Sequence, residues 1–314
     1  MSQTEVWVPT WLQSTWERLQ QAEAAGRLPH AVLFDGPPGW GKRFLARQFA
    51  RSLLGLTPRS PRLMSYGDEE SDGDLLAHRD VRLIQRGIAD SGRPRRQILI
   101  DQVRDLGEFL VRTAGAGGRR IAIIELAEEL NTNAANALLK RLEEPGSGCH
   151  LFLVSQRVNE VLPTIRSRCQ RLAVAPGSLD AARDWLAGQL SEGADAARLL
   201  QLVGGAPLLA RQRADSDLPA LADAVDAFLA GGPADPLIRD DRDRADQLLE
   251  LLYRALAAQV QASAANPPAA ALRYLERVQR ARRILSSQSN PNVTLLLEDL
   301  LLGPSGWITA QRAR

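Results

Sequence analysis

One short segment limits the fold of this chain more than any other. Residues 31–35 (AVLFD) form an apolar run, residues 36–43 (GPPGWGKR) follow at once, and a helical pattern begins at Phe44. Glycines let backbone N–H groups turn inward around phosphate oxygens, a lysine adds positive charge, and a helix N-terminus stands behind them. This order of strand, loop and helix predicts a phosphate loop rather than a chance glycine-rich turn. The candidate phosphate-binding residues are Gly36, Gly39, Gly41 and Lys42.

The last position of this loop differs from that of a catalytic phosphate loop. A hydroxyl is needed there to ligate Mg²⁺, and this chain has Arg43, which cannot be a metal ligand. One strand pattern ends in Glu125, where a metal-binding acid would stand, but Leu126 follows in place of a water-orienting carboxylate. Glu128 and Glu129 lie beyond the strand end, and we interpret them as a solvated helix entry. We therefore expect weak or no Mg²⁺-dependent ATP binding and no intrinsic ATPase activity.

Short β-rich runs alternate with helical patterns between residues 31 and 174. After the first run, further runs begin at Val81, Arg120, Leu151 and Arg171. They are continuous apolar stretches, which is typical of parallel strands covered on both faces. The alternation predicts an α/β domain with a five-stranded parallel sheet. Asn131 or Asn133 is the expected cap of a helix in this domain.

A chain of 314 residues exceeds what one compact core usually supports. After Pro176 and Gly177 the strand patterns end, and helical patterns continue with breaks at Gly204-Gly205, near Gly231 and near Ala265. These breaks predict an α/β domain and two helical domains. Their expected bounds are 1–174, 175–213 and 214–314.

Two leucine stripes mark the last helical domain. Together they hold more apolar surface than one small helical layer usually buries, so we expect part of it to face partner subunits. The stripes consist of Leu248, Leu251, Leu252 and Leu256, and of Leu295, Leu296, Leu297, Leu300 and Leu301.

Composition excludes several classes of protein. Lysine and arginine total 39 against 37 acidic residues, and a net charge of +2 gives no field that would drive the whole chain onto nucleic acid. The apolar run over residues 295–302 is interrupted by Glu298 and Asp299, so no membrane span is expected. Cys149 and Cys169 form no C-x-x-C pair, which leaves neither a disulfide framework nor a zinc site. Without a secretory signal pattern at the N-terminus, we expect a cytoplasmic protein.

Four sequence blocks together resemble a known family. They are GRLPHAVLFDGPPGWGKRFLARQFA, ILIDQVRDLGEFL, NTNAANALLKRLEEP and TIRSRCQRL, and they cover most of residues 1–175. In order and spacing they resemble the clamp-loader branch of the AAA+ ATPases and, within it, most closely the delta prime family of bacterial DNA polymerase III. The resemblance implies a P-loop AAA+ domain over residues 1–174, a small helical lid over 175–213, and an all-α collar over 214–314 that joins a pentameric ring.

The resemblance also implies roles for single residues. Residues 167–169 (SRC) fall on a family motif whose arginine reaches into the ATP site of a neighbouring subunit, which makes Arg168 the candidate arginine finger in trans. Pro207 stands where active members carry a lid arginine. Spacing alone favours a basic surface of Arg166, Arg168 and Arg171, or their pairing with acids near the strand, and only the resemblance favours the finger role of Arg168.

The function implied is that of a non-hydrolysing clamp-loader subunit, which helps load the sliding clamp onto primed DNA beside gamma/tau-type ATPase and delta-type subunits. The alternative is an ATP-hydrolysing motor subunit or a related DNA-remodelling ATPase, which Arg43, Leu126 and Pro207 disfavour. Many clamp-loader subunits carry a four-cysteine zinc module where this chain has the acidic stretch Thr57 to Asp74. We therefore expect no zinc and no required cofactor.

Overall fold

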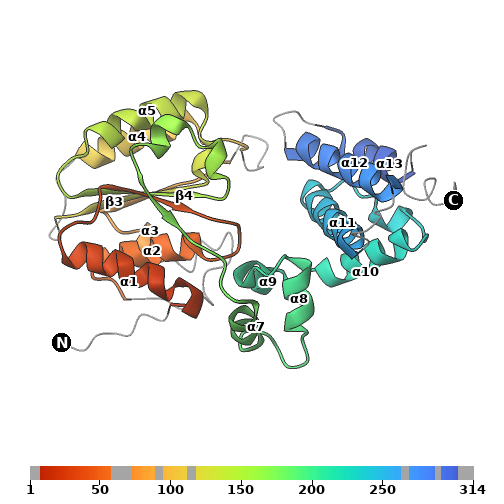
Figure 1. The fold of residues 1–314 in the computed structure, drawn as a ribbon. Coiled ribbons are helices and arrows are strands. Elements are labelled where there is room, and N and C mark those ends of the chain that lie inside the picture. The colour runs from red at the N-terminus through yellow and green to blue at the C-terminus, as the bar shows by residue number, and fades with distance from the viewer. Residues whose placement is uncertain are drawn as a thin grey trace. The chain divides into compact units, whose positions relative to one another are not determined.

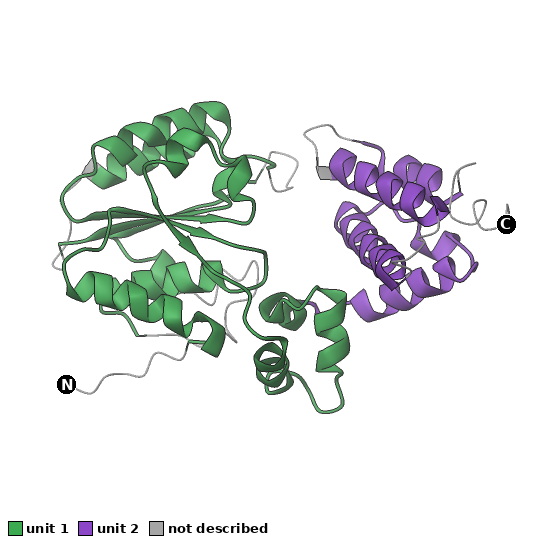
Figure 2. Cartoon of the chain, in the orientation of Figure 1, with its two compact units in different colours: residues 1–212 green, residues 213–314 purple. Residues whose placement is uncertain are grey.

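A computed structural model describes residues 8–57, 73–88, 95–111, 118–262, 269–286 and 291–302. The chain forms two compact units, residues 1–212 and 213–314 (Figure 2). The first unit contains a sheet, the helices that cover it and several shorter helices. The second has only helices among its described elements. Most of the acidic stretch after Thr57 and the predicted break near Ala265 lie outside the described residues.

The first unit is built on five parallel strands in the order β2-β3-β4-β1-β5, which confirms the predicted sheet. The central strands β1 and β3 are buried along their whole length. The two edge strands are not, since Gln170, Arg171 and Ala173 of β5 and Arg82 of β2 are exposed, so the expectation of full burial is wrong at both edges. An edge strand has a neighbour on one side only. The strands span Ala31–Asp35 (β1), Val81–Ile84 (β2), Arg120–Glu125 (β3), Cys149–Ser155 (β4) and Gln170–Ala173 (β5).

Helices cover both faces of this sheet, with α1 and α2 on one face and α4 and α5 on the other (Figure 1). These four helices span Thr10–Ala24 (α1), Lys42–Leu53 (α2), Ile100–Val111 (α4) and Thr132–Glu143 (α5). The shorter elements are α3 (Gly73–Leu76), η3 (Ala127–Glu129), η4 (Val158–Glu160), α6 (Pro163–Arg166), α7 (Leu179–Ala187), α8 (Ala196–Leu202) and α9 (Pro207–Arg213).

Helix α5 begins where the sequence indicates. The side chain of Asn131 accepts a 2.8 Å hydrogen bond from the backbone N–H of Ala134, which makes Asn131 rather than Asn133 the cap. Leu138 and Leu142 then lie in the core between the helix and the sheet. The helix ends at Glu143.

The second unit stacks its long helices on one another. All four leucines of the stripe that begins at Leu248 are buried inside the unit, so this stripe offers no surface to a partner. The reason is that α10, α12 and α13 all pack against α11. On α13, Leu295 and Leu302 remain exposed. The elements span Leu218–Leu229 (α10), Asp235–Leu237 (η5), Arg242–Ala262 (α11), Ala269–Ser286 (α12) and Val293–Leu302 (α13).

Among the helices that the structure describes, none combines the length and the apolar character that crossing a membrane requires.

Candidate functional site

The loop between β1 and α2 has a backbone that depends on its glycines. Gly36 has a φ of +150°, and a Cβ there would lie 2.3 Å from the carbonyl oxygen of Val174. Gly39 has a φ of +75°, in the left-handed region that favours glycine. Gly41 is the N-cap of α2, and Lys42 is its first residue. The predicted loop residues thus lie together at the carboxyl end of β1.

The side chain of Lys42 turns back into this loop. Its Nζ donates a 2.6 Å hydrogen bond to the carbonyl oxygen of Pro37, and the residue is 4% exposed. Burial lowers the pKa of Lys42 from 10.5 to about 8, while the carboxylates of Glu128 and Asp35 act in the opposite direction. The carboxylates that favour the charged form of this lysine are therefore those of Glu128 and Asp35.

Both carboxylate oxygens of Glu125 are bound by arginines. Arg43 Nε lies 2.5 Å from Oε2, and Arg47 approaches Oε1 with Nε at 2.8 Å and Nη2 at 2.7 Å. The side chain of Glu125 is only 5% exposed. Mg²⁺ requires oxygen ligands in near-octahedral geometry. Here Arg43 stands where the motif has a hydroxyl, and the guanidinium groups of Arg43 and Arg47 bind the carboxylate that a metal would need. The residues at this end of β3 do not fit a magnesium ion.

Glu128 and Glu129 are largely buried, so their interpretation as a solvated helix entry is wrong. The side chain of Glu128 is 1% exposed, and its Oε1 accepts a 3.0 Å hydrogen bond from the N–H of Gln156. Glu129 lies 2.9 Å from Arg86 Nε, and burial raises the pKa of Glu129 to about 7. A backbone N–H therefore binds one oxygen of Glu128 and an arginine pairs with Glu129, whereas Oε2 of Glu128 is buried with no hydrogen-bond partner among the described residues.

The start of α9 packs directly on the phosphate loop. The N–H of Leu208 donates a 3.2 Å hydrogen bond to the carbonyl oxygen of Gly39. A Cβ on Gly39 would lie 2.7 Å from the Cβ atoms of both Ala206 and Leu209. Apolar side chains of the expected lid therefore lie against the loop that would cradle phosphates, and Pro207 begins the helix.

Three tryptophans join the same loop to α1 and α7. The ring of Trp11 meets that of Trp40 at 6.1 Å and that of Trp185 at 5.5 Å, both edge to face. Trp11 Nε1 also donates a 3.3 Å hydrogen bond to the carbonyl oxygen of Trp40. Sequence reasoning missed this cluster, because no periodic pattern connects three tryptophans so far apart in the chain.

Arg168 lies at the opposite end of the sheet from the phosphate loop. The loop follows Asp35 at the carboxyl end of β1, whereas Arg168 precedes Gln170 at the amino end of β5. The two strands are parallel, with Val32 opposite Gln170 and Asp35 opposite Ala173. Four strand residues at about 3.3 Å each separate the two ends. The structure therefore does not bring Arg168 together with Gly36 to Lys42.

The guanidinium of Arg168 is exposed but held. Nη2 lies 2.6 Å from Glu143 Oε1, and Nη1 donates a 3.0 Å hydrogen bond to the carbonyl oxygen of Thr164. Arg171 instead donates to the buried carboxylate of Asp35, with Nε at 2.7 Å. The neighbouring Cys169 is half-buried, and burial raises the pKa of its thiol to about 12, which disfavours a nucleophile.

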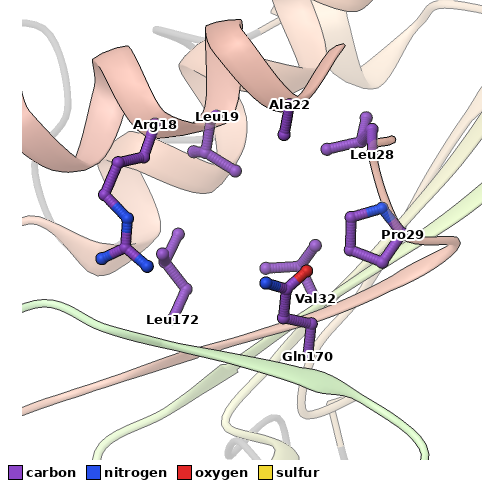
Figure 3. Close-up of a pocket in the computed structure, with 8 residues that line it drawn as sticks. All are labelled: Arg18, Leu19, Ala22, Leu28, Pro29, Val32, Gln170 and Leu172. Carbon is purple, nitrogen blue, oxygen red and sulfur yellow. The ribbon is translucent and has the colours of Figure 1, made fainter. Parts of the chain in front are cut away.

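A small pocket opens between α1 and the sheet edge formed by β5 (Figure 3). Its volume of about 60 Å³ is far below the several hundred that small-molecule sites usually have, so it cannot hold a nucleotide. The lining residues are Arg18, Leu19, Ala22, Leu28, Pro29, Val32, Gln170 and Leu172.

The family follows from the region that contains both candidate sites. Residues 11–178 match the family model described as DNA polymerase III, delta subunit, and this match covers more than half of the chain. The chain belongs to this family. The membership confirms the resemblance that the phosphate-loop and SRC blocks indicated.

Curated relatives agree with this family and are named as one type of subunit, delta'. The chain is 41% identical over 210 residues to DNA polymerase III subunit delta' of Pseudomonas aeruginosa, covering 64% of this chain and 60% of the relative. The delta' subunit of Escherichia coli is 32% identical over 208 residues, with 64% and 59% covered. The chain thus spans about 60% of the length of these curated relatives.

More distant matches lie on other subunits. A gamma/tau subunit of Mycobacterium tuberculosis is 34% identical over 152 residues, which is 48% of this chain and 25% of that protein. A solved DNA polymerase III gamma subunit-related protein of Thermotoga maritima superposes with a TM-score of 0.51 at 18% identity, covering 97% of this chain and all of that one. This last match shows the fold alone.

Proposed function

We propose that the chain is a non-hydrolysing subunit of a DNA polymerase III clamp loader, which helps load the sliding clamp onto primed DNA. In this proposal its own phosphate loop carries no Mg²⁺-dependent ATP chemistry. Its contribution to hydrolysis is Arg168, inserted into the ATP site of a neighbouring gamma/tau-type subunit.

The observation that carries the first half is the binding of Glu125 by Arg43 and Arg47. A carboxylate that serves Mg²⁺ must keep an oxygen available, and both oxygens here are within ion-pair distance of a guanidinium. The hydrogen bond from Leu208 to Gly39 also supports the absence of ATP chemistry at this loop, since the start of α9 lies against it.

The position of Arg168 supports the second half. Because it lies at the sheet end away from its own phosphate loop, its exposed guanidinium is available to a site on another molecule. A planar guanidinium spreads positive charge over phosphate oxygens that become more negative in the transition state. Fingers of this kind are worth about 10³ to 10⁵ in rate in GTPases.

The partners follow from this placement. A subunit without turnover acts only beside one that hydrolyses ATP, so gamma/tau-type subunits are the proposed neighbours, with a delta-type subunit in the same ring. The sliding clamp and primed DNA are contacted through the complex. An ATP-hydrolysing motor subunit is the other candidate, and no observation at Glu125 favours it.

Calorimetry on the isolated chain tests the proposal. We expect no saturable heat on titration with Mg·ATP and no phosphate release, with or without primed DNA. Micromolar binding that disappears when EDTA removes Mg²⁺ would contradict the proposal, as would turnover by the purified chain. A gamma/tau-type subunit titrated under the same conditions is the positive control.

A further inference from the structure

Glu143 lies at an electrostatically unfavourable position for its own helix. It is the last residue of α5, and Glu144 follows as the C-cap. The C-terminal end of a helix carries partial negative charge, so two carboxylates there repel it. Helix stability therefore does not account for an acid at this position.

The partner of Glu143 is the proposed finger. Glu143 Oε1 lies 2.6 Å from Arg168 Nη2, although the two residues are 25 positions apart in the chain. The side chains are 51% and 37% exposed. Glu144 is exposed as well and has no ion pair among the described residues.

A second contact fixes the plane of the same guanidinium. Arg168 Nη1 donates to the carbonyl oxygen of Thr164 at 3.0 Å and lies 3.5 Å from Ser167 Oγ. The hydroxyl of Ser167 donates to that same carbonyl at 3.1 Å, which holds the turn after α6 in place. Two acceptors on different elements, α5 and α6, thus restrict an arginine that would otherwise sample many rotamers.

We propose that Glu143 is a positioning residue for Arg168, an inference that rests on the proposed function. It holds the guanidinium ready to meet a phosphate on the neighbouring subunit. An arginine has five N–H donors in a planar fork, so the donors not directed at Glu143 and Thr164 remain for phosphate oxygens. An exposed ion pair is weak enough to yield when the more highly charged triphosphate arrives.

The test is a double-mutant cycle in the assembled clamp loader, with DNA-stimulated ATP turnover as the measurement. We expect Arg168→Ala to lower kcat by at least about tenfold. Glu143→Ala should lower kcat by about two- to fivefold, the range that an exposed ion pair supports, with the KM for ATP unchanged. Glu143→Gln keeps an acceptor oxygen and should recover most of this loss. In the Arg168→Ala background, Glu143→Ala should have no further effect.

Glu144→Ala is the matched control, since it removes the same charge from the same helix end and should leave kcat unchanged. If Arg168→Ala lowers turnover while Glu143→Ala does not, the positioning role is wrong and the finger stands. An increase in turnover by Glu143→Ala would mean that Glu143 competes with the phosphate for Arg168, and would overturn the inference. An equal loss on Glu143→Ala in the wild-type and Arg168→Ala backgrounds would overturn it too. No loss in Arg168→Ala would remove the proposed finger and this inference together.

Discussion

At Glu125, the structure indicates a structural role rather than a catalytic one, because two arginines bind its carboxylate. Its carboxylate and the guanidinium of Arg47 are each only 5% exposed, and loss of Arg47 leaves the buried Oε1 of Glu125 without its donor while Arg43 still binds Oε2. We predict that Arg47→Met, which keeps the aliphatic stem, lowers the free energy of unfolding by about 3 kcal/mol. Urea denaturation with an unchanged m-value measures this loss.

Arg104→Met is the control for Arg47→Met, because Arg104 forms an exposed pair with Asp101. Its unfolding free energy should change by no more than about 0.5 kcal/mol. Equal small losses of unfolding free energy in both variants would mean that Arg47 does not form the buried ion pair with Glu125.

Lys42 makes the free energy of unfolding depend on pH in the alkaline range. Its pKa falls from 10.5 to about 8 on burial, so between these values the unfolded chain binds the proton more tightly than the folded one. Stability therefore rises with pH through this window, and it does not respond to this group well below pH 8. We predict that the unfolding free energy of the wild type, relative to Lys42→Met, increases by about 2 kcal/mol from pH 7.5 to pH 10. Parallel pH profiles of the two proteins would contradict this.

The residues of the candidate site differ in how far the sequence could predict them. Arg43 and Leu126 stand at motif positions, so the departure from a catalytic site could be seen at once. Arg47 was missed, although its spacing of four from Arg43 places both on one face of α2. The burial of Glu128 could not be predicted, because the N–H of Gln156 that binds its Oε1 belongs to a different segment.

Among the elements, α9 packs directly on the phosphate loop. Gly39→Ala should lower the free energy of unfolding by about 3 kcal/mol, since a Cβ meets Ala206 and Leu209 in addition to the left-handed backbone. Gly193→Ala is the matched control: its φ is +89°, and a Cβ there meets nothing within 4 Å. It should lose only about 1–2 kcal/mol. Equal losses in thermal or urea unfolding would indicate that α9 does not rest on the loop in solution.

The elements themselves could be predicted where a local signal exists. Apolar runs located all five strands, and an asparagine cap with an apolar face located α5. The exposure of β5 could not be predicted, because strand order is set by pairing between distant segments. The docking of α9 and the tryptophan cluster around Trp11 depend on tertiary contacts that no local pattern encodes.

For the whole molecule, the exposed leucines of α13 are the proposed contribution of the second unit to ring assembly. Leu295 and Leu302 are 61% and 54% exposed and lie seven residues apart on one helix face. Leu295→Arg should leave the unfolding midpoint unchanged and weaken association with partner subunits about tenfold, measured by sedimentation. Leu179→Arg is the control, since Leu179 is 64% exposed in the first unit. Equal association by the two variants would exclude this surface from the ring.

The central claim is that this chain acts on ATP through Arg168 and in trans. The most direct test is ATP turnover by the reconstituted loader on primed DNA, with Arg168→Ala compared against Arg27→Ala. Arg27 is also exposed and precedes β1 at the same end of the sheet, with no ion pair among the described residues. We predict unchanged assembly for both variants, a loss of at least about tenfold for Arg168→Ala, and wild-type turnover for Arg27→Ala. Equal, mild losses in both would show a general basic surface and contradict the claim.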